Sequence, residues 1–179
     1  MPDDTDPSHC LELITDLAEI DADIARWGCS FLTVEERGRG RPAFAATLGL
    51  AHTYGHPELV VVRGSQTLMV AILTGLSAMV RVDDVRLSHW SRPRLEAIPF
   101  QLLDVHPTHF ETLMEFWPAF ASERGLRTAD PAALQAVIPD RYFCAHHAKR
   151  KYWLDDPRPL VERPRSAGHR QRRPKRRAS

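Results

Sequence analysis

The chain has 179 residues and almost equal numbers of basic and acidic side chains, with 24 Lys or Arg and 23 Asp or Glu. This length fits one domain that buries a single core, and it requires no second domain. The three cysteines lack paired spacing, which argues against a disulfide framework and against a CxxC metal site. We find no apolar leader and no run typical of a membrane span, so we expect a cytoplasmic protein without a membrane segment.

The charges are unevenly distributed along the chain. Residues 1–162 carry 16 basic and 23 acidic groups, a net charge of −7, whereas residues 163–179 carry 8 basic groups and no acidic one. We expect a single domain over 1–162 and a disordered basic tail over 163–179, which either contacts nucleic acid or acidic partners or is a solvated terminus without function. The tail residues expected to make such contacts are Arg170, Arg172, Arg173, Lys175, Arg176 and Arg177.

Residues 8–28 are typical of an amphipathic helix that Ser8 caps and Gly28 ends. Their apolar side chains recur at helical spacing, which predicts that they face the core. These side chains are Leu13, Leu17, Ile20, Ile24 and Trp27. Short strands are then predicted over 29–36, 43–50 and 58–62. The third of these is nearly all apolar, which indicates a central strand covered on both faces.

Ser65 is expected to cap a helix that runs to about Arg81 and lies deep in the fold, because apolar residues surround it almost completely. A strand over 97–105 follows. The next predicted element is a helix with Thr108 as its cap.

Pro118 is expected to break or kink that helix, and Gly125 is expected to end it. Residues 133–140 offer a last short strand. Because strands and helices interleave without a regular βαβ rhythm, we predict an α+β domain: a mainly antiparallel sheet of about five strands, packed with three helices.

The stretch TLGLAHTYGHPELVVV, residues 47–62, sets polar side chains between two apolar runs. In an extended backbone every second side chain points to the same side, so four polar side chains would lie together: His52, Tyr54, His56 and Glu58. His52, His56 and Glu58 could then ligate a metal, or Glu58 could orient His56 as a general base. Gly55 and Pro57 favour a turn instead, in which His56 and Glu58 satisfy buried backbone groups.

A second cluster, formed by Asp104, His106 and His109, lies around the start of the predicted helix near residue 108. Neutral histidines at a helix N-terminus could ligate a metal or contact an anion. Capping and packing in the first turn explain the same residues without a ligand.

A third cluster lies in YFCAHHAKRKYW and contains Cys144, His146 and His147. Cys and His at this spacing can bind zinc, but no second half of a zinc site follows. The interleaved aromatic and basic residues could instead stack bases and neutralise phosphates, or they could form a basic loop anchored to the core.

Four segments, DIARWG, PAFAATLGL, GHPELVVV and PAALQAVIPD, occur in an order that resembles the bacterial domain-of-unknown-function family 4262. The resemblance covers roughly residues 20–140. It implies that the family's central motif is carried by Gly49, His56, Pro57 and Glu58. The chain departs from the family pattern at Cys29, Ala46 and Ile138, where the family usually shows tryptophan, tyrosine and tryptophan, and in CAHHAKRKYW, which replaces a closing proline and tryptophan sequence.

Two hypotheses follow. In one, an uncharacterised domain binds a small molecule or metal near the His56-Pro57-Glu58 turn, with His56 as base or ligand. In the other, the domain is a non-enzymatic interaction module whose basic tail contacts nucleic acid or acidic partners. The residues identify no cofactor, no particular small molecule and no particular protein partner.

Overall fold

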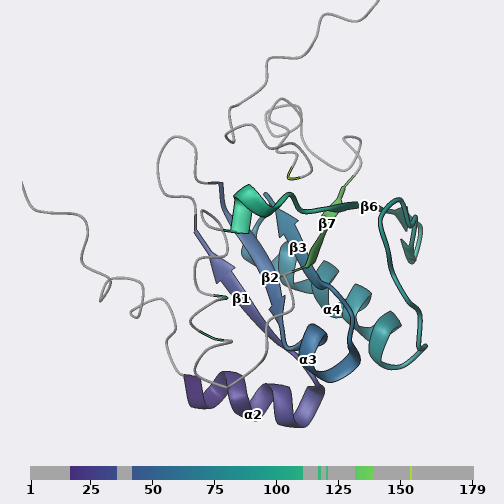
Figure 1. Cartoon of the computed structure of the whole chain (residues 1–179). Helices are drawn as coiled ribbons and strands as arrows, with labels where there is room; N and C mark the ends of the chain where they lie inside the picture. Colours follow the sequence, from purple (N-terminus) through teal and green to yellow (C-terminus); the bar gives the residue numbers. More distant parts are fainter. Residues whose placement is uncertain are drawn as a thin grey trace, which may run out of the picture.

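The computed structural model describes residues 17–35, 42–110, 117, 120, 132–138 and 154 (Figure 1). The elements are α2 (Leu17–Trp27), β1 (Ser30–Val34), β2 (Phe44–Leu48), α3 (Leu50–Tyr54), β3 (Glu58–Val62), α4 (Gln66–Arg81), β4 (Arg94–Leu95), β5 (Ile98–Pro99), β6 (Gln101–Asp104), the 3₁₀ turn η1 (Pro107–His109) and β7 (Ala133–Val137). The predicted α+β class is confirmed.

A five-stranded sheet forms the centre of the domain, with the strand order β1-β2-β3-β7-β6. Three neighbouring pairs are antiparallel, whereas β3 and β7 are parallel, so the sheet is mixed. The predicted central strand is confirmed, since every residue of β3 is buried between β2 and β7. The short strands β4 and β5 pair separately.

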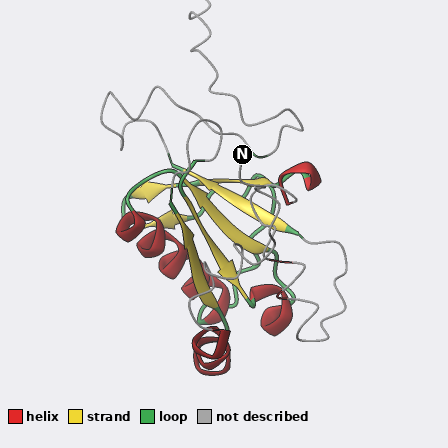
Figure 2. Cartoon of the chain, turned by 90° about the vertical axis from the view of Figure 1, so that its left-hand side faces the viewer, coloured by secondary structure: helices red, strands yellow, loops and turns green. Residues whose placement is uncertain are grey.

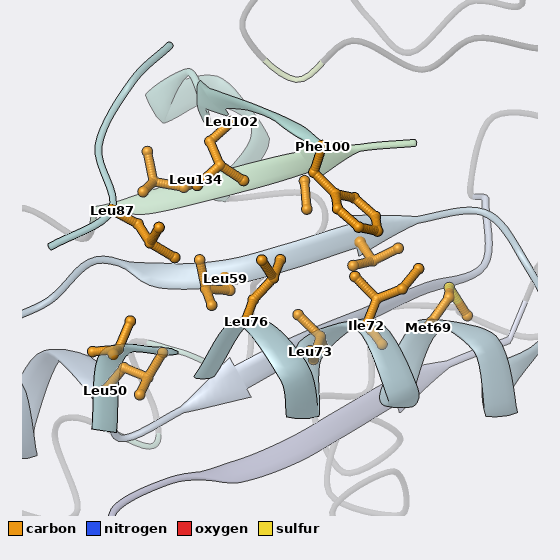
Figure 3. Packing of buried hydrophobic residues seen from close by; sticks show 14 of the residues in the cluster. Leu50, Leu59, Met69, Ile72, Leu73, Leu76, Leu87, Phe100, Leu102 and Leu134 are labelled. Carbon is orange, nitrogen blue, oxygen red and sulfur yellow. The ribbon is translucent and has the colours of Figure 1, made fainter. Parts of the chain in front are cut away.

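Helix α4 lies against one face of the sheet, as the turned view shows (Figure 2). It begins as predicted, because the Ser65 side chain accepts a hydrogen bond from the Leu68 backbone N–H. Met69, Ile72 and Leu76 point from α4 into the core between helix and sheet (Figure 3). The helix is not enclosed on all sides, however: Leu68 is 40% exposed. The prediction that α4 lies deep in the fold is therefore wrong for its outer face.

A second apolar cluster is formed by residues of β2, β3 and the later chain, including Phe44, Val60, Phe110, Trp117 and Phe120. Strand residues alternate between the two clusters, as the period of two in a strand requires. The sheet is therefore covered on both faces.

Helix α2 packs beside β1 and ends at Gly28, whose φ of 77° confirms the predicted glycine terminus. Ile20 and Ile24 are partly buried against the second cluster, as predicted. Trp27 is 47% exposed, so its predicted place in the core is wrong. The indole lies instead against the guanidinium of Arg26, which is 4.6 Å from the ring centroid.

Helix α3 was not predicted. The helix expected after Thr108 lies mostly outside the described residues, although Phe110, Trp117 and Phe120 within it are helical. The turn η1 precedes it. His106, not Thr108, caps the 3₁₀ turn η1, because its ring accepts the N–H of Thr108. The expected features at Ser8, Leu13, Pro118 and Gly125 lie outside the described residues.

Candidate functional site

The stretch between β2 and β3 is a short helix and not an extended backbone. Helix α3 spans five residues between Gly49 and Gly55, which have φ angles of 104° and 60°. Glycine reaches this left-handed region without the steric cost that other residues meet. In addition, a Cβ atom added at residue 49 would lie only 3.0 Å from the Ile24 side chain. The extended alternative for residues 52–58 is therefore wrong, while the turn alternative agrees with the structure.

Glu58 is the first residue of β3 and is 1% exposed. Its Oε1 accepts the backbone N–H groups of Gly49 and Ala51 at 3.0 and 3.1 Å. Its Oε2 accepts the Thr47 hydroxyl at 2.6 Å, and the same hydroxyl oxygen accepts the Leu59 N–H at 2.8 Å. No side chain of α3 itself caps the helix, so Glu58 satisfies the free N–H groups of its first turn from the neighbouring strand.

The environment of Glu58 acts on its pKa in two opposed ways. Burial raises the pKa, while the hydrogen bonds from Thr47 and from the backbone of Ala51, Gly49 and Leu50 lower it. Burial wins, and the pKa of Glu58 rises to about 7. Near neutral pH this carboxyl can therefore gain or lose a proton, which an exposed glutamate does not do.

His56 precedes the strand and is 3% exposed. Its Nδ1 lies 2.6 Å from the carbonyl oxygen of Pro57, and its Nε2 accepts the Leu87 N–H at 3.1 Å. These contacts assign a neutral ring with its proton on Nδ1, and this N–H donates a hydrogen bond to the Pro57 carbonyl oxygen. Burial lowers the pKa of His56, and the nearby charge of Arg86 acts in the same direction. Both ring nitrogens are therefore engaged by the backbone.

The structure does not place the three predicted metal ligands in one site. His52 lies on the exposed part of α3, whereas His56 and Glu58 are buried and have different partners. Among the described residues, we find no group of three or more His, Cys, Asp or Glu side chains that could hold a metal ion.

Cys29 is a buried polar feature that the sequence patterns did not single out as a site. Cys29 is 2% exposed, and its thiol lies near the side chains of Ser77 and Arg81 in α4. Burial raises the pKa of this thiol, while the Arg81 guanidinium opposes that shift and Glu58 adds to it. A single cysteine between a strand and a helix has no sequence pattern that would have predicted these contacts.

The second predicted cluster is explained by local capping. His106 Nδ1 lies 3.0 Å from the Thr108 hydroxyl and caps η1. His109 is 3% exposed, whereas Asp104 lies at the surface, where its N–H donates to His89 Nδ1 at 2.9 Å. Because His89 Nδ1 accepts this hydrogen bond, it carries no proton, and the Asp104 carboxylate 3.3 Å away is not its ion-pair partner in this tautomer.

The remaining predicted site residues lie outside the part of the chain that the structure describes. They are Cys144, His146 and His147 of the third cluster and the tail residues 170–177.

The fold and the turn together define a small α+β domain in which a mixed sheet carries a buried glutamate that holds a short helix. A family model with the description "Domain of unknown function (DUF4262)" matches residues 23–142. The chain belongs to this family, which confirms the predicted resemblance. Neither the curated proteins nor the solved structures contain a match. In the described part of the chain, every helix is too short or too polar to cross a membrane.

Proposed function

We propose that this protein is a cytoplasmic interaction module rather than an enzyme. One observation carries the proposal: His56 and Glu58, the reactive side chains of the family motif, are buried and bound to the backbone. A general base must reach the proton that it removes from a substrate. The motif then serves to hold α3 and the segment at Leu87 in place, and binding depends on other surfaces.

An exposed aromatic side chain supports this proposal. Trp90, in the segment between α4 and β4, is 60% exposed. Aromatic side chains of this kind are enriched where proteins bind partners.

The basic tail adds an electrostatic component to the proposal. Its eight basic groups would attract nucleic acid or acidic partners, while the body of the chain carries a net charge of −7. Contacts to phosphates release counterions, so this binding weakens as salt rises.

The tail is tested in the full-length chain by replacing its six central basic residues, those at positions 170, 172, 173, 175, 176 and 177, with glutamine. Retention on immobilised nucleic acid and on immobilised polyglutamate is measured at two salt concentrations. We expect the wild-type protein to be retained at low salt and the variant to elute earlier. Equal elution of the two proteins from both supports would reject the role of the tail.

A second candidate is a small-molecule or metal site near the His56-Pro57-Glu58 turn, with candidates His52, His56 and Glu58. The raised pKa of Glu58 favours it, because a carboxyl that titrates near 7 suits acid–base chemistry. Metal analysis of the purified protein and of His56→Ala tests this candidate. Stoichiometric metal that is lost in the variant supports it, and metal-free protein counts against it.

A further inference from the structure

The segment between α4 and β4 presents a row of aromatic and basic side chains. Residues 86–94, which read RLSHWSRPR, contain three arginines and no acidic residue. We call them the aromatic-basic segment. Trp90 is 60% exposed, and Arg86, Arg92 and Arg94 are exposed as well. None of the three arginines forms an ion pair with another described residue.

Exposure alternates along the second half of the segment. Trp90, Arg92 and Arg94 are exposed, whereas Ser91 is partly covered and Pro93 is buried. From Ser91 to Arg94 this alternation is typical of an extended chain, in which every second residue points the same way. Arg92 and Arg94 therefore share one face, while Trp90 has a φ of 65° and lies in the turn just before them, where its indole is exposed.

The backbone of the segment is fixed along the outer edge of β6. The Trp90 N–H donates to the Leu102 carbonyl at 2.8 Å, and the Leu102 N–H donates to the Ser91 carbonyl at 2.9 Å. The Phe100 N–H donates to the Pro93 carbonyl at 2.9 Å. A surface that is ordered in advance loses less conformational entropy when it binds.

The Trp90 ring is also supported from the side. His89 meets it edge to face, with ring centroids 5.0 Å apart and an interplanar angle of 81°. The His89 ring is in turn held by the Asp104 N–H. Trp90 has a φ of 65°, a left-handed conformation in which a large side chain is uncommon, so the segment holds this indole outward at a conformational cost.

We infer that the surface formed by Trp90, Arg92 and Arg94 binds single-stranded nucleic acid, with a base stacked on the indole and phosphates on the two guanidinium groups. Aromatic platforms beside basic side chains are the usual elements of such binding. An acidic peptide without aromatic residues would use the arginines but offers no planar group for the indole, and a duplex keeps its bases stacked inside. The inference rests on the proposed function, because it names the partner of the interaction module.

Acidic side chains limit the reach of this surface. Asp83 and Asp84 precede the segment, Glu96 follows it, and Asp104 lies beside His89; all four are exposed. These carboxylates repel phosphates, so we expect a bound nucleic acid strand to contact only the surface formed by Trp90, Arg92 and Arg94. Stacking on Trp90 then contributes a large share of the affinity.

The first experiment measures binding of the full-length protein to fluorescein-labelled oligothymidylate of roughly 20 nucleotides, longer than one binding site, by fluorescence anisotropy. We expect Trp90→Ala to weaken binding roughly fivefold to a hundredfold, the range of one lost base stack, and Trp90→Phe to restore part of the loss. Arg92→Gln with Arg94→Gln should reduce the slope of log K against log salt by about 1.4, since each phosphate contact on a single strand contributes about 0.7.

Trp27→Ala is the matched control. Trp27 is also an exposed tryptophan beside an arginine, but its ring already lies against the Arg26 guanidinium. This variant should bind oligothymidylate as the wild-type protein does. Equal losses in Trp27→Ala and Trp90→Ala would overturn the inference.

The tail variant described above separates the two proposals. If neutralising the tail leaves binding unchanged and that binding still depends on Trp90, the inference holds although the proposed role of the tail fails. If binding depends on the tail and is unchanged in Trp90→Ala, the inference is wrong and the tail's role stands. Absence of binding at low salt, or equal competition by duplex DNA or polyglutamate, also overturns the inference.

Discussion

Two regions of this domain contain a histidine next to aromatic or charged residues, but their side chains differ in exposure to solvent. At the turn before β3, His56 and Glu58 are buried, and their polar atoms bind the backbone. In the aromatic-basic segment, Trp90 and its neighbouring arginines are exposed, and only the backbone beneath them is bound. The first region holds the structure together, and the second is available to a partner.

The difference shows that residue type alone is a poor guide to function in this chain. A histidine and a carboxylate suggested chemistry, yet both are used as hydrogen-bond partners for a helix start and a loop. A buried polar group must be satisfied, and the nearest partners are usually backbone groups. Access to solvent therefore separates the two regions better than composition does. The following predictions test this separation, from the largest expected effect to the smallest.

Glu58→Ala should destabilise the domain by about 3 to 5 kcal/mol, because it leaves the Thr47 hydroxyl and two backbone N–H groups of α3 buried without an acceptor. Urea unfolding of variant and wild type measures this loss. Glu58→Gln is the matched control, since it keeps one carbonyl acceptor and most of the volume, and it should lose clearly less. A loss below about 1 kcal/mol in Glu58→Ala would show that the carboxylate does not hold α3.

Stability should depend on pH through Glu58. The pKa of Glu58 in the folded state is about 7, above the ordinary glutamate value of 4.5. The folded protein then binds a proton that the unfolded chain has released, so this contribution is present at low pH and is lost as pH rises from 4.5 through 7. One pH unit corresponds to about 1.4 kcal/mol, so the contribution is on the order of 3 kcal/mol.

His56 opposes this trend, because its lowered pKa makes the folded protein lose stability as pH falls below about 6.5. The Glu58 contribution is therefore isolated by comparing wild type with Glu58→Gln from pH 5 to pH 8. The difference in unfolding free energy between the two proteins should change steadily across this range. A constant difference would contradict the assigned protonation of Glu58.

His56→Ala should cost about 1 to 3 kcal/mol, because the Leu87 N–H loses its acceptor and a buried ring is removed. Thermal unfolding at pH 7 measures the effect. His56→Asn retains a polar side chain and should recover part of the loss. If His56→Ala were as stable as wild type, the ring would not brace the segment at Leu87.

Trp90→Ala should change stability by less than about 0.5 kcal/mol, because the indole is mostly exposed and adds little to the core. Trp27→Ala should behave in the same way. Thermal unfolding of both variants checks this expectation. A large loss in Trp90→Ala would mean that the indole is part of the structure and not an open surface.

Most of the fold was predictable from local patterns. The apolar run at 58–62 predicted a buried central strand, and Ser65 before an apolar stretch predicted the start of α4. Both signals are local, since they arise from burial on two faces and from one cap. The parallel pairing of β3 with β7 joins residues more than 70 positions apart and has no local pattern.

Helix α3 was missed for a related reason. Five residues are too few to show a helical period, and the group that satisfies the start of the helix is Glu58, beyond its far end. The candidate site depended on this segment, so the extended alternative failed while the turn alternative agreed with the structure. The exposure of Trp90 could not be predicted either, since tryptophan is more often largely buried.

The place of β7 in the sheet has a consequence for how the chain folds during synthesis. This strand lies between β3 and β6, although both are made before it. Until residues 133–137 leave the ribosome, two strands lack their shared neighbour and their edges are open to wrong pairing. Completion of the domain therefore waits for its last described strand, and long-range pairing of this kind favours slow folding.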